Sequence, residues 1–446
     1  MKILDPETLE KIKEQYDSLP YPQIPLEKTP RDDKVFDTLF IHNLVTPYYL
    51  RYQTVIDTSG KLILDAGCGS GYNSLVLAIA NPGAKVIGVD VSEASVDFAK
   101  TRLEHHGIDN AEFHVMRLED VPSLGLKFDY INCDEVLYMV PNPVECLQAL
   151  KDVLADTGII RGNFHSELQR HDYYRAQALF KMMGLMDDNP EDLEVELVIE
   201  VMKSLKDEVD LKRKAWNPDL EKLENKEAIL MNHMIQGDRG FIIPEVFSML
   251  DTTHLDFISM VAWRHWEIND LFKDVDELPP FLALSLPEIS VEERLRLFEL
   301  LHPAHRLIDF WCAHPRTTTP LPMSPNMWAP RQWQQARISL HPQLAHTKVK
   351  EAVLEAIDKR KSLDLRQYLL KSSQTPVMID YVDAACLLPL WEHSQTFTDL
   401  LSRRLMLSPI NPLTLEPMNE VKVAQDLQSV LLKLEVFLYV LIEQSV

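Results

Sequence analysis

A glycine-rich stretch that begins at residue 65 constrains the fold more than any other part of the chain. Residues 62–64 form a short apolar run that is typical of a buried strand. Glycine then stands at every second position, at Gly67, Gly69 and Gly71, and residues 72–80 have the apolar spacing of a helix. A strand, a glycine turn and a helix make the first half of a nucleotide-binding crossover, because glycine lets the backbone approach a ligand closely. This pattern predicts an α/β fold.

The spacing of these glycines separates two classes of cofactor. A dinucleotide fingerprint needs its third glycine three residues after the second, and Tyr72 stands there instead. The third glycine comes early, at Gly71, and Asp65 stands two places before the first. This acid-x-Gly-x-Gly-x-Gly pattern resembles motif I of class I methyltransferases that use S-adenosyl-L-methionine (SAM). The resemblance implies SAM as the cofactor and a Rossmann-like sheet of seven strands.

The resemblance also implies roles for single residues. Asp65 would lie by the methionine end of SAM and help hold its ammonium, and the loop amides would suit its carboxylate. Asp90 ends the second apolar run and would accept the ribose hydroxyls. Leu118 would contact the adenine, and Glu119 or Asp120 could accept from its amine. The predicted cofactor-binding residues are Tyr16, Tyr21, Asp65, Gly67, Cys68, Gly69, Gly71, Asp90, Val91, Leu118, Glu119 and Asp134.

An extended arm precedes this domain. Prolines at positions 20, 22 and 25 fix an extended path, and Tyr16 and Tyr21 place two phenols on it. A Tyr-x-x-x-Pro-Tyr-Pro arm ahead of motif I resembles a group of larger bacterial class I methyltransferases. Two interpretations stay open, a stiff arm that packs on the domain and a lid over the SAM site.

Candidate catalytic residues follow the fourth and fifth predicted strands, at 128–133 and 158–165. The carboxyl ends of these strands should face the transferable methyl group. The segment resembles the Phe-Asp-x-Ile…Val-Leu-x-x-x-Pro-x-Pro sequence of the same family and lacks the Asn/Asp-Pro-Pro-Tyr/Phe motif of enzymes that methylate adenine or glutamine. A base is needed only if the acceptor is protonated, and a structural role is the alternative for each candidate. The candidates are Asp134, Glu135, Tyr138 and His165.

The remaining chain predicts large additions to the SAM-binding domain. We expect a sixth strand at 254–262 and a seventh at 306–312, antiparallel at the end of the sheet. The additions resemble, in architecture only, bacterial protein-lysine methyltransferases with a C-terminal regulatory domain. The last predicted helix, 419–443, has a broad apolar face for core packing or for a homodimer seam. The predicted divisions are an arm and cap helix (1–55), the SAM-binding domain (56–315) with helical insertions at about 166–240 and 264–303, a proline-rich linker (316–346) and a helical C-terminal domain (347–446).

The net charge and the cysteine positions limit which binding partners and which cellular compartment we expect. The net charge of −23 argues against broad contact with nucleic acid. Residues 185–224 carry thirteen acidic and six basic side chains, which indicates a solvated helix face or recognition of a basic substrate. The five cysteines lie far apart, so neither a metal site nor a disulfide framework is expected. With no signal-peptide pattern and no membrane-spanning apolar run, we expect a cytoplasmic protein.

These observations predict a SAM-dependent methyltransferase that acts on a small molecule or on a protein or peptide. Two alternatives from other classes stay open. An NAD-linked oxidoreductase is disfavoured by the glycine spacing. A non-catalytic SAM-binding or scaffold protein is favoured by the large helical additions and by the absence of an obvious base.

Overall fold

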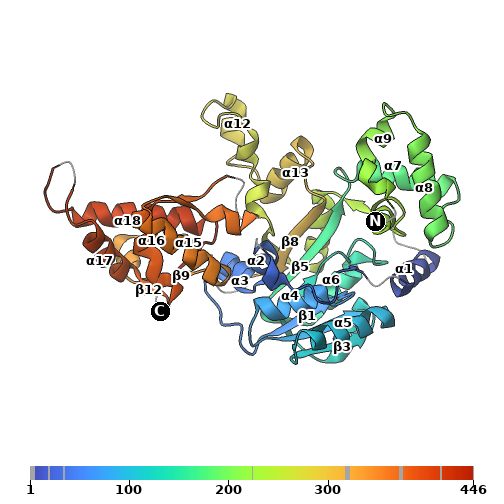
Figure 1. Cartoon of the computed structure of the whole chain (residues 1–446), viewed down its shortest axis with the longest axis horizontal. Coiled ribbons are helices and arrows are strands. Elements are labelled where there is room, and N and C mark those ends of the chain that lie inside the picture. Colours follow the sequence, from blue (N-terminus) through green and yellow to red (C-terminus); the bar gives the residue numbers. More distant parts are fainter. Residues whose placement is uncertain are drawn as a thin grey trace.

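Figure 1 shows a central sheet with helices on both faces and three lobes around it. The computed structural model describes residues 6–18, 21–33, 36–222, 225–316, 322–370, 375–411 and 414–444. Residues 19 and 20 of the predicted arm and 317–321 of the predicted linker therefore lie outside the described residues. Within the described ranges, no helix combines the length and the apolar character needed to cross a membrane.

The central sheet has eight strands, and seven of them run in the order β3-β2-β1-β4-β5-β8-β7. The first five pair in parallel, β8 is antiparallel to β5 and β7, and the short β6 pairs with β5. This arrangement confirms the predicted Rossmann-like sheet. The strands are β1 (Leu62–Ala66), β2 (Lys85–Asp90), β3 (Ala111–Val115), β4 (Phe128–Cys133), β5 (Leu154–Ser166), β6 (Gly240–Phe241), β7 (Asp256–Met260) and β8 (Leu307–Ala313).

The seventh predicted strand is antiparallel, but it does not end the sheet. It corresponds to β8, which lies between β5 and β7 and pairs with β5 from Ile159↔Ala313 to His165↔Leu307. Phe310, Trp311 and Cys312 of β8 are fully buried, whereas most of β7 is only half-buried. A strand buried on both faces suits the interior of a sheet, and a half-exposed strand suits its edge.

Helices cover the two faces of the sheet because neighbouring residues of each strand point to opposite sides. Ile63, Val86 and Tyr130 enter one core, and Leu64 and Ile87 enter the other. Side-chain caps begin two of the helices, since Ser92 accepts from Ser95 N and Asn142 from Val144 N. The helices are α2 (Asp37–His42), α3 (Val45–Tyr52), α4 (Tyr72–Ala80), α5 (Glu93–His105), α6 (Pro143–Asp152) and α11 (Ile243–Thr253).

Both predicted insertions are helical. The first packs around a core of its own, which includes Phe180, Val198, Met202 and Leu230. It contains α7 (His171–Met182), α8 (Asp192–Ser204), α9 (Asp210–Ala215) and α10 (Lys226–His233), and the second contains α12 (Pro280–Ser285) and α13 (Val291–Leu301). Ahead of the sheet, α1 (Pro6–Ser18) lies beside the first insertion, where Lys11 Nζ donates to Asp187 O at 2.7 Å.

The C-terminal domain is mainly helical but contains small antiparallel sheets. Its helices are α14 (Pro330–Gln334), α15 (Thr347–Asp358), α16 (Tyr381–Leu387), α17 (Phe397–Leu407) and α18 (Glu420–Glu435). A three-stranded sheet has the order β12-β9-β13. The strands of this domain are β9 (Ala336–Leu340), β10 (Leu363–Asp364), β11 (Met378–Ile379), β12 (Gln395–Thr396) and β13 (Val440–Gln444).

Two expectations for this region are corrected. The predicted linker contains β9, the central strand of the sheet, and the predicted helix 419–443 ends at Glu435. Leu438 has a φ of +55°, which a continuing helix does not allow, and the chain turns into β13. The apolar face of α18 buries Leu427 and Leu431 inside the domain, so core packing accounts for it. A homodimer through this helix stays a prediction.

Helix α3 joins the C-terminal domain to the sheet through Tyr49. Its hydroxyl lies 2.9 Å from Ile442 N, 3.1 Å from Ile442 O and 3.0 Å from Glu435 Oε1. Buried residues of α2, α3 and the C-terminal domain belong to one continuous core. The C-terminal domain is thus an integral part of the folded unit.

We predict that Tyr49→Phe lowers the free energy of unfolding by about 1–3 kcal/mol. The phenyl ring keeps the packing, but buried polar groups of Ile442 lose their phenol partner. Urea unfolding followed by circular dichroism measures the change. Tyr52→Phe is the control, because the Tyr52 hydroxyl bonds Thr157 O at an exposed site. Equal stability of the two variants would contradict the prediction.

Candidate functional site

The glycine loop between β1 and α4 is shaped for close approach. Gly67 and Gly71 have φ values of +84° and +79°, a region that glycine adopts without a steric penalty. A Cβ atom on Gly67 would lie 2.3 Å from Val136 Cγ2, and one on Gly71 would lie 2.6 Å from Ala99 Cα. The loop therefore packs directly against the segment after β4 and against α5.

The loop amides are already hydrogen-bonded within the chain. Gly67 N and Cys68 N donate to Val89 O, and Gly71 N donates to Cys68 O. Gly69 N donates to the Asp90 carboxylate, and Ser70 N donates to Tyr21 O, each at 2.9 Å. The expectation that these amides hold the cofactor carboxylate does not match this arrangement. The loop instead contributes its shape and the placement of Asp90.

Asp65 lies beneath the loop and is only 1% exposed. Its carboxylate accepts from Ser74 Oγ at 2.5 Å and from Asn132 Nδ2 at 2.9 Å. Burial raises the pKa of Asp65 to about 6, against the opposing effect of these two hydrogen bonds. In this position Asp65 ties β1 to α4 and β4, rather than presenting an open carboxylate to a ligand.

Asp90 is fixed at the carboxyl end of β2. One carboxylate oxygen accepts from Gly69 N at 2.9 Å and the other from Ser92 N at 3.0 Å. Burial raises the pKa of this carboxyl, and the backbone N–H groups partly offset the rise. Each oxygen keeps a second lone pair, so the geometry suits two neighbouring hydroxyl donors. Ribose binding by Asp90 stays a prediction that this geometry favours.

The remaining predicted cofactor-binding residues differ in their accessibility. Val91 follows Asp90 and is 39% exposed, so it offers an apolar surface. Leu118 is buried, and Glu119 forms an ion pair with Arg117 at 3.3 Å. Cys68 is buried, and burial raises the pKa of its thiol well above the ordinary value. Cys68 therefore contributes packing beneath the loop.

The N-terminal arm is docked on the glycine loop. Besides the Tyr21 carbonyl contact, Ser70 Oγ donates to Pro22 O at 2.7 Å. The guanidinium of Arg102 donates to Ser70 O at 2.9 Å and to Ile24 O at 2.7 Å, so it joins arm and loop. The Tyr16 hydroxyl donates to Met139 Sδ, and its ring lies 6.4 Å from that of Tyr21. The arm thus brings both phenols to the site, and its action as a lid stays a prediction.

Polar side chains on one face of β5 form a second layer that the sequence-based prediction mostly missed. Arg161, Asn163 and His165 are all at least 97% buried, although only His165 was predicted. Their signal was present in the sequence, because they alternate with glycine and phenylalanine at a period of two after the apolar residues 159 and 160. Buried polar side chains at that spacing must find partners on neighbouring strands.

Arg161 is the hub of this layer. Its guanidinium pairs with Asp309 of β8 at 2.8 Å and with both oxygens of Asp134 at 3.3 Å. It also donates to Asn132 Oδ1 at 3.2 Å and to His42 Nε2 at 2.9 Å. Burial opposes its charge, but the two carboxylates outweigh burial and raise the pKa of Arg161.

Asp134, predicted for both catalysis and cofactor binding, lies at the carboxyl end of β4 with its side chain 14% exposed. It accepts from Asn73 Nδ2 at 3.1 Å and from Asn163 Nδ2. The Asn163 side chain also receives the backbone N–H of Glu135 at 2.8 Å. Asp134 is therefore a fixed carboxylate that still reaches the surface.

The other three catalytic candidates form one cluster with Arg306. The Tyr138 hydroxyl donates to Glu135 Oε2 at 2.9 Å, and its ring stacks on His165 with centroids 3.7 Å apart. Arg306 contacts both carboxylate oxygens of Glu135. Burial opposes ionisation of Glu135, but the contacts with His165 and Arg306 outweigh it and hold the pKa of this carboxyl well below its ordinary value.

Both ring nitrogens of His165 are engaged. Nδ1 lies 2.6 Å from the carboxylate of Asp238, and Nε2 lies 3.0 Å from NH1 of Arg306. A carboxylate only accepts, so Nδ1 carries a proton, and Nε2 lies between Arg306 and Glu135 Oε2, which is 3.5 Å away. Asp238 also pairs with Arg170 at 2.9 Å, and both side chains are fully buried. His165 thus orients Arg306 and Asp238 and holds no free lone pair for a substrate proton.

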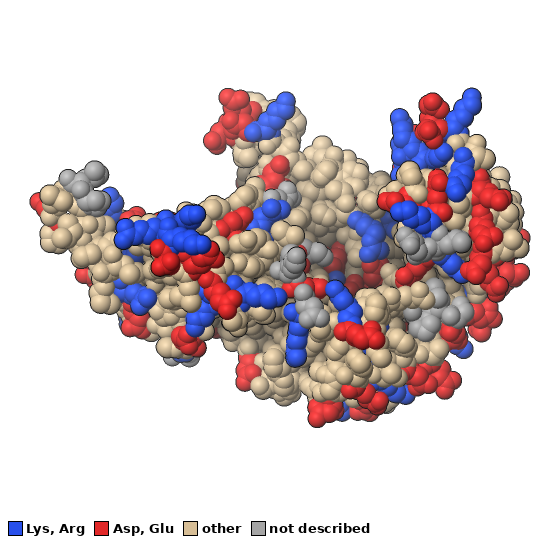
Figure 2. All heavy atoms as spheres, in the orientation of Figure 1, with Lys and Arg blue, Asp and Glu red and all other residues tan. Residues whose placement is uncertain are grey.

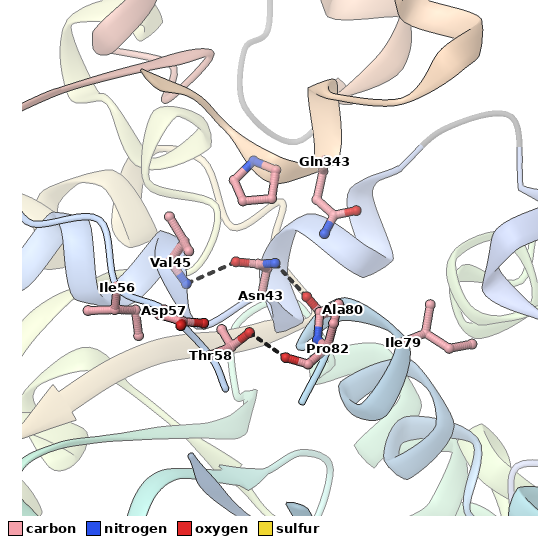
Figure 3. Close-up of a pocket in the computed structure, with 10 residues that line it drawn as sticks. Asn43, Val45, Ile56, Asp57, Thr58, Ile79, Ala80, Pro82 and Gln343 are labelled. Atoms are coloured by element: carbon pink, nitrogen blue, oxygen red, sulfur yellow. Dashed lines mark hydrogen bonds between the residues drawn. The ribbon is translucent and has the colours of Figure 1, made fainter. Parts of the chain in front are cut away.

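A crevice of about 320 Å³ lies at the opposite end of the strands, next to the amino ends of β1 and β2. Figure 3 shows that Asn43 bonds Ala80 O and Val45 N, and that Thr58 bonds Pro82 O. Pro342 and Gln343 border the crevice from the C-terminal domain. The hydrogen bonds drawn there join the α2–α3 turn and the start of β1 to the end of α4, and they are remote from the carboxyl ends of the strands.

Comparison with known proteins matches part of the chain to a methyltransferase domain. A family model described as a methyltransferase domain matches residues 57–226. An uncharacterized protein of Synechococcus sp. is 26% identical over 313 residues, which cover 69% of this chain and 71% of that protein. Ubiquinone biosynthesis O-methyltransferase of Coxiella burnetii is 38% identical over 102 residues, or 23% of this chain and 42% of that enzyme.

Solved structures extend the similarity of fold beyond the SAM-binding part. The structure of PKMT2 from Rickettsia typhi matches with a TM-score of 0.59 and 15% identity, over 92% of this chain and 76% of that chain. Together with the strand order and the strand–glycine-loop–helix unit, the family model shows that this chain has a class I methyltransferase domain that uses SAM. This confirms the family predicted from the glycine spacing and sets aside the NAD-linked alternative.

We predict that Asp90→Ala weakens SAM binding at least tenfold, as measured by calorimetry. The change removes the acceptor for two hydroxyls, and each charge-assisted hydrogen bond contributes roughly 1.5–3 kcal/mol. Asp129→Ala is the matched control, because Asp129 accepts from Leu62 N at the other end of the β1–β4 pair. Wild-type affinity in a folded Asp90→Ala variant would contradict the ribose assignment.

Asp65 should make the stability of the protein fall between pH 5 and pH 8. Its folded-state pKa of about 6 lies above the ordinary value of 3.8, so the stabilisation is complete below 3.8 and is lost as the pH rises through 6. The expected contribution over this interval is about 1.4 kcal/mol. Urea unfolding at both pH values should show a smaller fall for Asp65→Asn than for the wild type; an unchanged fall would argue against the raised pKa.

Proposed function

We propose that this enzyme transfers the methyl group of SAM to an amino group of a protein or peptide. The observation that carries the proposal is an excess of carboxylates, flanked by phenol rings, at the open end of the sheet. Six carboxylates and three guanidinium groups gather there, and they are Asp65, Asp90, Asp134, Glu135, Asp238, Asp309, Arg161, Arg170 and Arg306. Such a site favours cations, and both SAM and an amine acceptor carry positive charge.

Different carboxylates suit different parts of the cofactor. Asp65 is buried and engaged, so Asp134, with its partly exposed side chain, is the better partner for the methionine ammonium. Asp90 suits the ribose, and the exposed Val91 side chain suits the adenine face. SAM supplies an activated methyl group, and the residues of this chain hold it, orient the acceptor and exclude water.

The surface above the site is wide enough for a macromolecule. Figure 2 shows a broad hollow between the C-terminal domain, the α12–α13 lobe and the first insertion. In the same view of Figure 1, β5 and β8 lie between these lobes. A wide hollow supports a peptide segment as the acceptor, and the net charge of −23 argues against a polyanion.

The cluster around Glu135 suits a cationic acceptor and leaves no general base on His165. A phenol acceptor ionises near pH 10 and gains from a general base, but the ring nitrogens of His165 are occupied by Asp238 and Arg306. An amine acceptor that enters as an ammonium first gives its extra proton to solvent, and its new N–CH₃ bond then forms as the C–S bond breaks. Tyr138 is buried against His165 and bonds Glu135, so the half-buried Tyr16 is the phenol ring that can bind a cationic head group.

A cytoplasmic location belongs to the same proposal. All five cysteines are free and buried, which fits a reducing compartment.

The test is transfer of labelled methyl from SAM to a panel of acceptors. Lysine-containing basic peptides should accept label, whereas the same peptides with acetylated lysines and amino termini, and simple phenols, should not. Mass spectrometry then locates the methyl group. Label that enters phenols or nucleic acid instead would overturn the amine assignment. If no component of a cell lysate accepts label from SAM, a non-catalytic role is favoured.

We predict that Glu135→Gln lowers methyl transfer at least tenfold while SAM affinity changes less than about threefold. The amide cannot pair bidentately with Arg306, and the negative charge beside Tyr138 is lost. Single-turnover assays measure transfer, and calorimetry measures binding. Glu167→Gln, at a nearby exposed position, is the matched control. Unchanged transfer in Glu135→Gln would remove this residue from the acceptor site.

A further inference from the structure

Helix α2 contacts the C-terminal domain with two aromatic side chains. The ring of Phe36, directly before the helix, stacks on His346 at 4.7 Å, and that of Phe40 lies 4.5 Å from His341. The backbone N–H of Phe36 donates to Tyr368 O at 2.9 Å. The position of α2 is therefore tied to the C-terminal domain.

The last residue of the same helix reaches the cofactor side of the sheet. His42 is 3% exposed, with Nδ1 2.7 Å from Thr38 O and Nε2 2.9 Å from NH1 of Arg161. A carbonyl oxygen only accepts and a guanidinium only donates. His42 is therefore neutral, with its proton on Nδ1 and its Nε2 lone pair turned to Arg161.

Arg161 carries this contact on to Asp134. The guanidinium is held firmly on the Asp309 side, at 3.0 and 2.8 Å, whereas both bonds to Asp134 measure 3.3 Å. NH1 is the nitrogen that His42 accepts from, and it also faces Asp134 Oδ2. The Nε2 atom of His42 thus fixes the orientation of Arg161 NH1, and Asp134 Oδ2 contacts the same nitrogen.

We propose that His42 is a positioning residue for SAM binding, through which α2 and the C-terminal domain set the Asp134 carboxylate. The inference rests on the proposed function in one respect, the pairing of Asp134 with the methionine ammonium. His42 itself touches neither SAM nor the acceptor. It acts by holding Arg161 in the orientation that presents Asp134 to the cation.

Two substitutions of His42 separate its two hydrogen bonds. In His42→Gln, Oε1 takes the place of Nε2 and still accepts from Arg161, but the bond to Thr38 is lost. In His42→Asn, Nδ2 takes the place of Nδ1 and still donates to Thr38, but nothing reaches Arg161. We expect His42→Asn to weaken SAM binding about tenfold, the effect of one lost charge-assisted hydrogen bond, and His42→Gln to stay within about threefold of the wild type.

A second ligand shows whether the effect travels through Asp134. 5′-Methylthioadenosine lacks the amino-acid portion of SAM, so its affinity should stay within about threefold of the wild type in both variants. Calorimetry with the full-length protein measures all six affinities. Normal SAM binding by His42→Asn, a larger loss in His42→Gln than in His42→Asn, or equal losses for both ligands would each overturn the proposal, the last by showing a general packing role.

A third variant keeps the proposal testable if His42→Asn does not fold. Asp134→Asn should lose more affinity for SAM than for 5′-methylthioadenosine, and it leaves His42 in place. Where both fold, the double variant should lose little more than either single variant, because the two residues act in one chain of contacts. Additive losses, or an Asp134→Asn variant with normal SAM affinity, would overturn the inference. Failure of the wild type to bind SAM would instead contradict the proposed function itself.

Discussion

The buried guanidinium of Arg161 is the constraint on which the cofactor end of this protein depends. A charge buried at this depth is costly unless it is paired and fully hydrogen-bonded. Partners come from β4, β8 and α2, in the form of Asp134, Asp309 and His42. Because each partner belongs to a different element, one side chain of β5 fixes the relative positions of all of them.

This constraint explains why the site is both rigid and acidic. Asp309 and Asp134 carry two negative charges, and Arg161 neutralises one of them. Asp90, Glu135 and Asp238 are held by separate donors. The donors are backbone amides and guanidinium groups, so each carboxylate is held in a defined direction. A sulfonium or an ammonium that enters such a site meets oriented negative charge without first reorganising it.

The segments added to the common sheet contact it near the carboxyl ends of the strands. The arm bonds the glycine loop through Tyr21 and Ser70, and the first insertion reaches His165 through Asp238. The second insertion leads into Arg306, which contacts Glu135. Each added segment thus ends in a contact near the carboxyl ends of the strands, where we propose that SAM and the acceptor bind, and insertions at the rim of a shared fold can set specificity without altering the sheet.

The sequence by itself determined the α/β class, the glycine loop, the cofactor family and the helical nature of both insertions. Those features are local, since strand and helix periodicity and the spacing of Asp65 and the glycines are visible within a few tens of residues. Only the tertiary structure decided that β8 lies inside the sheet, that residues 440–444 form a strand against β9, and that the loop amides are taken by Val89, Asp90 and Tyr21. It also decided which polar residues meet, because His42, Arg161, Asp238 and Arg306 are far apart in the sequence. Their contacts depend on strand order and burial, and neither quantity is encoded in any short stretch of the chain.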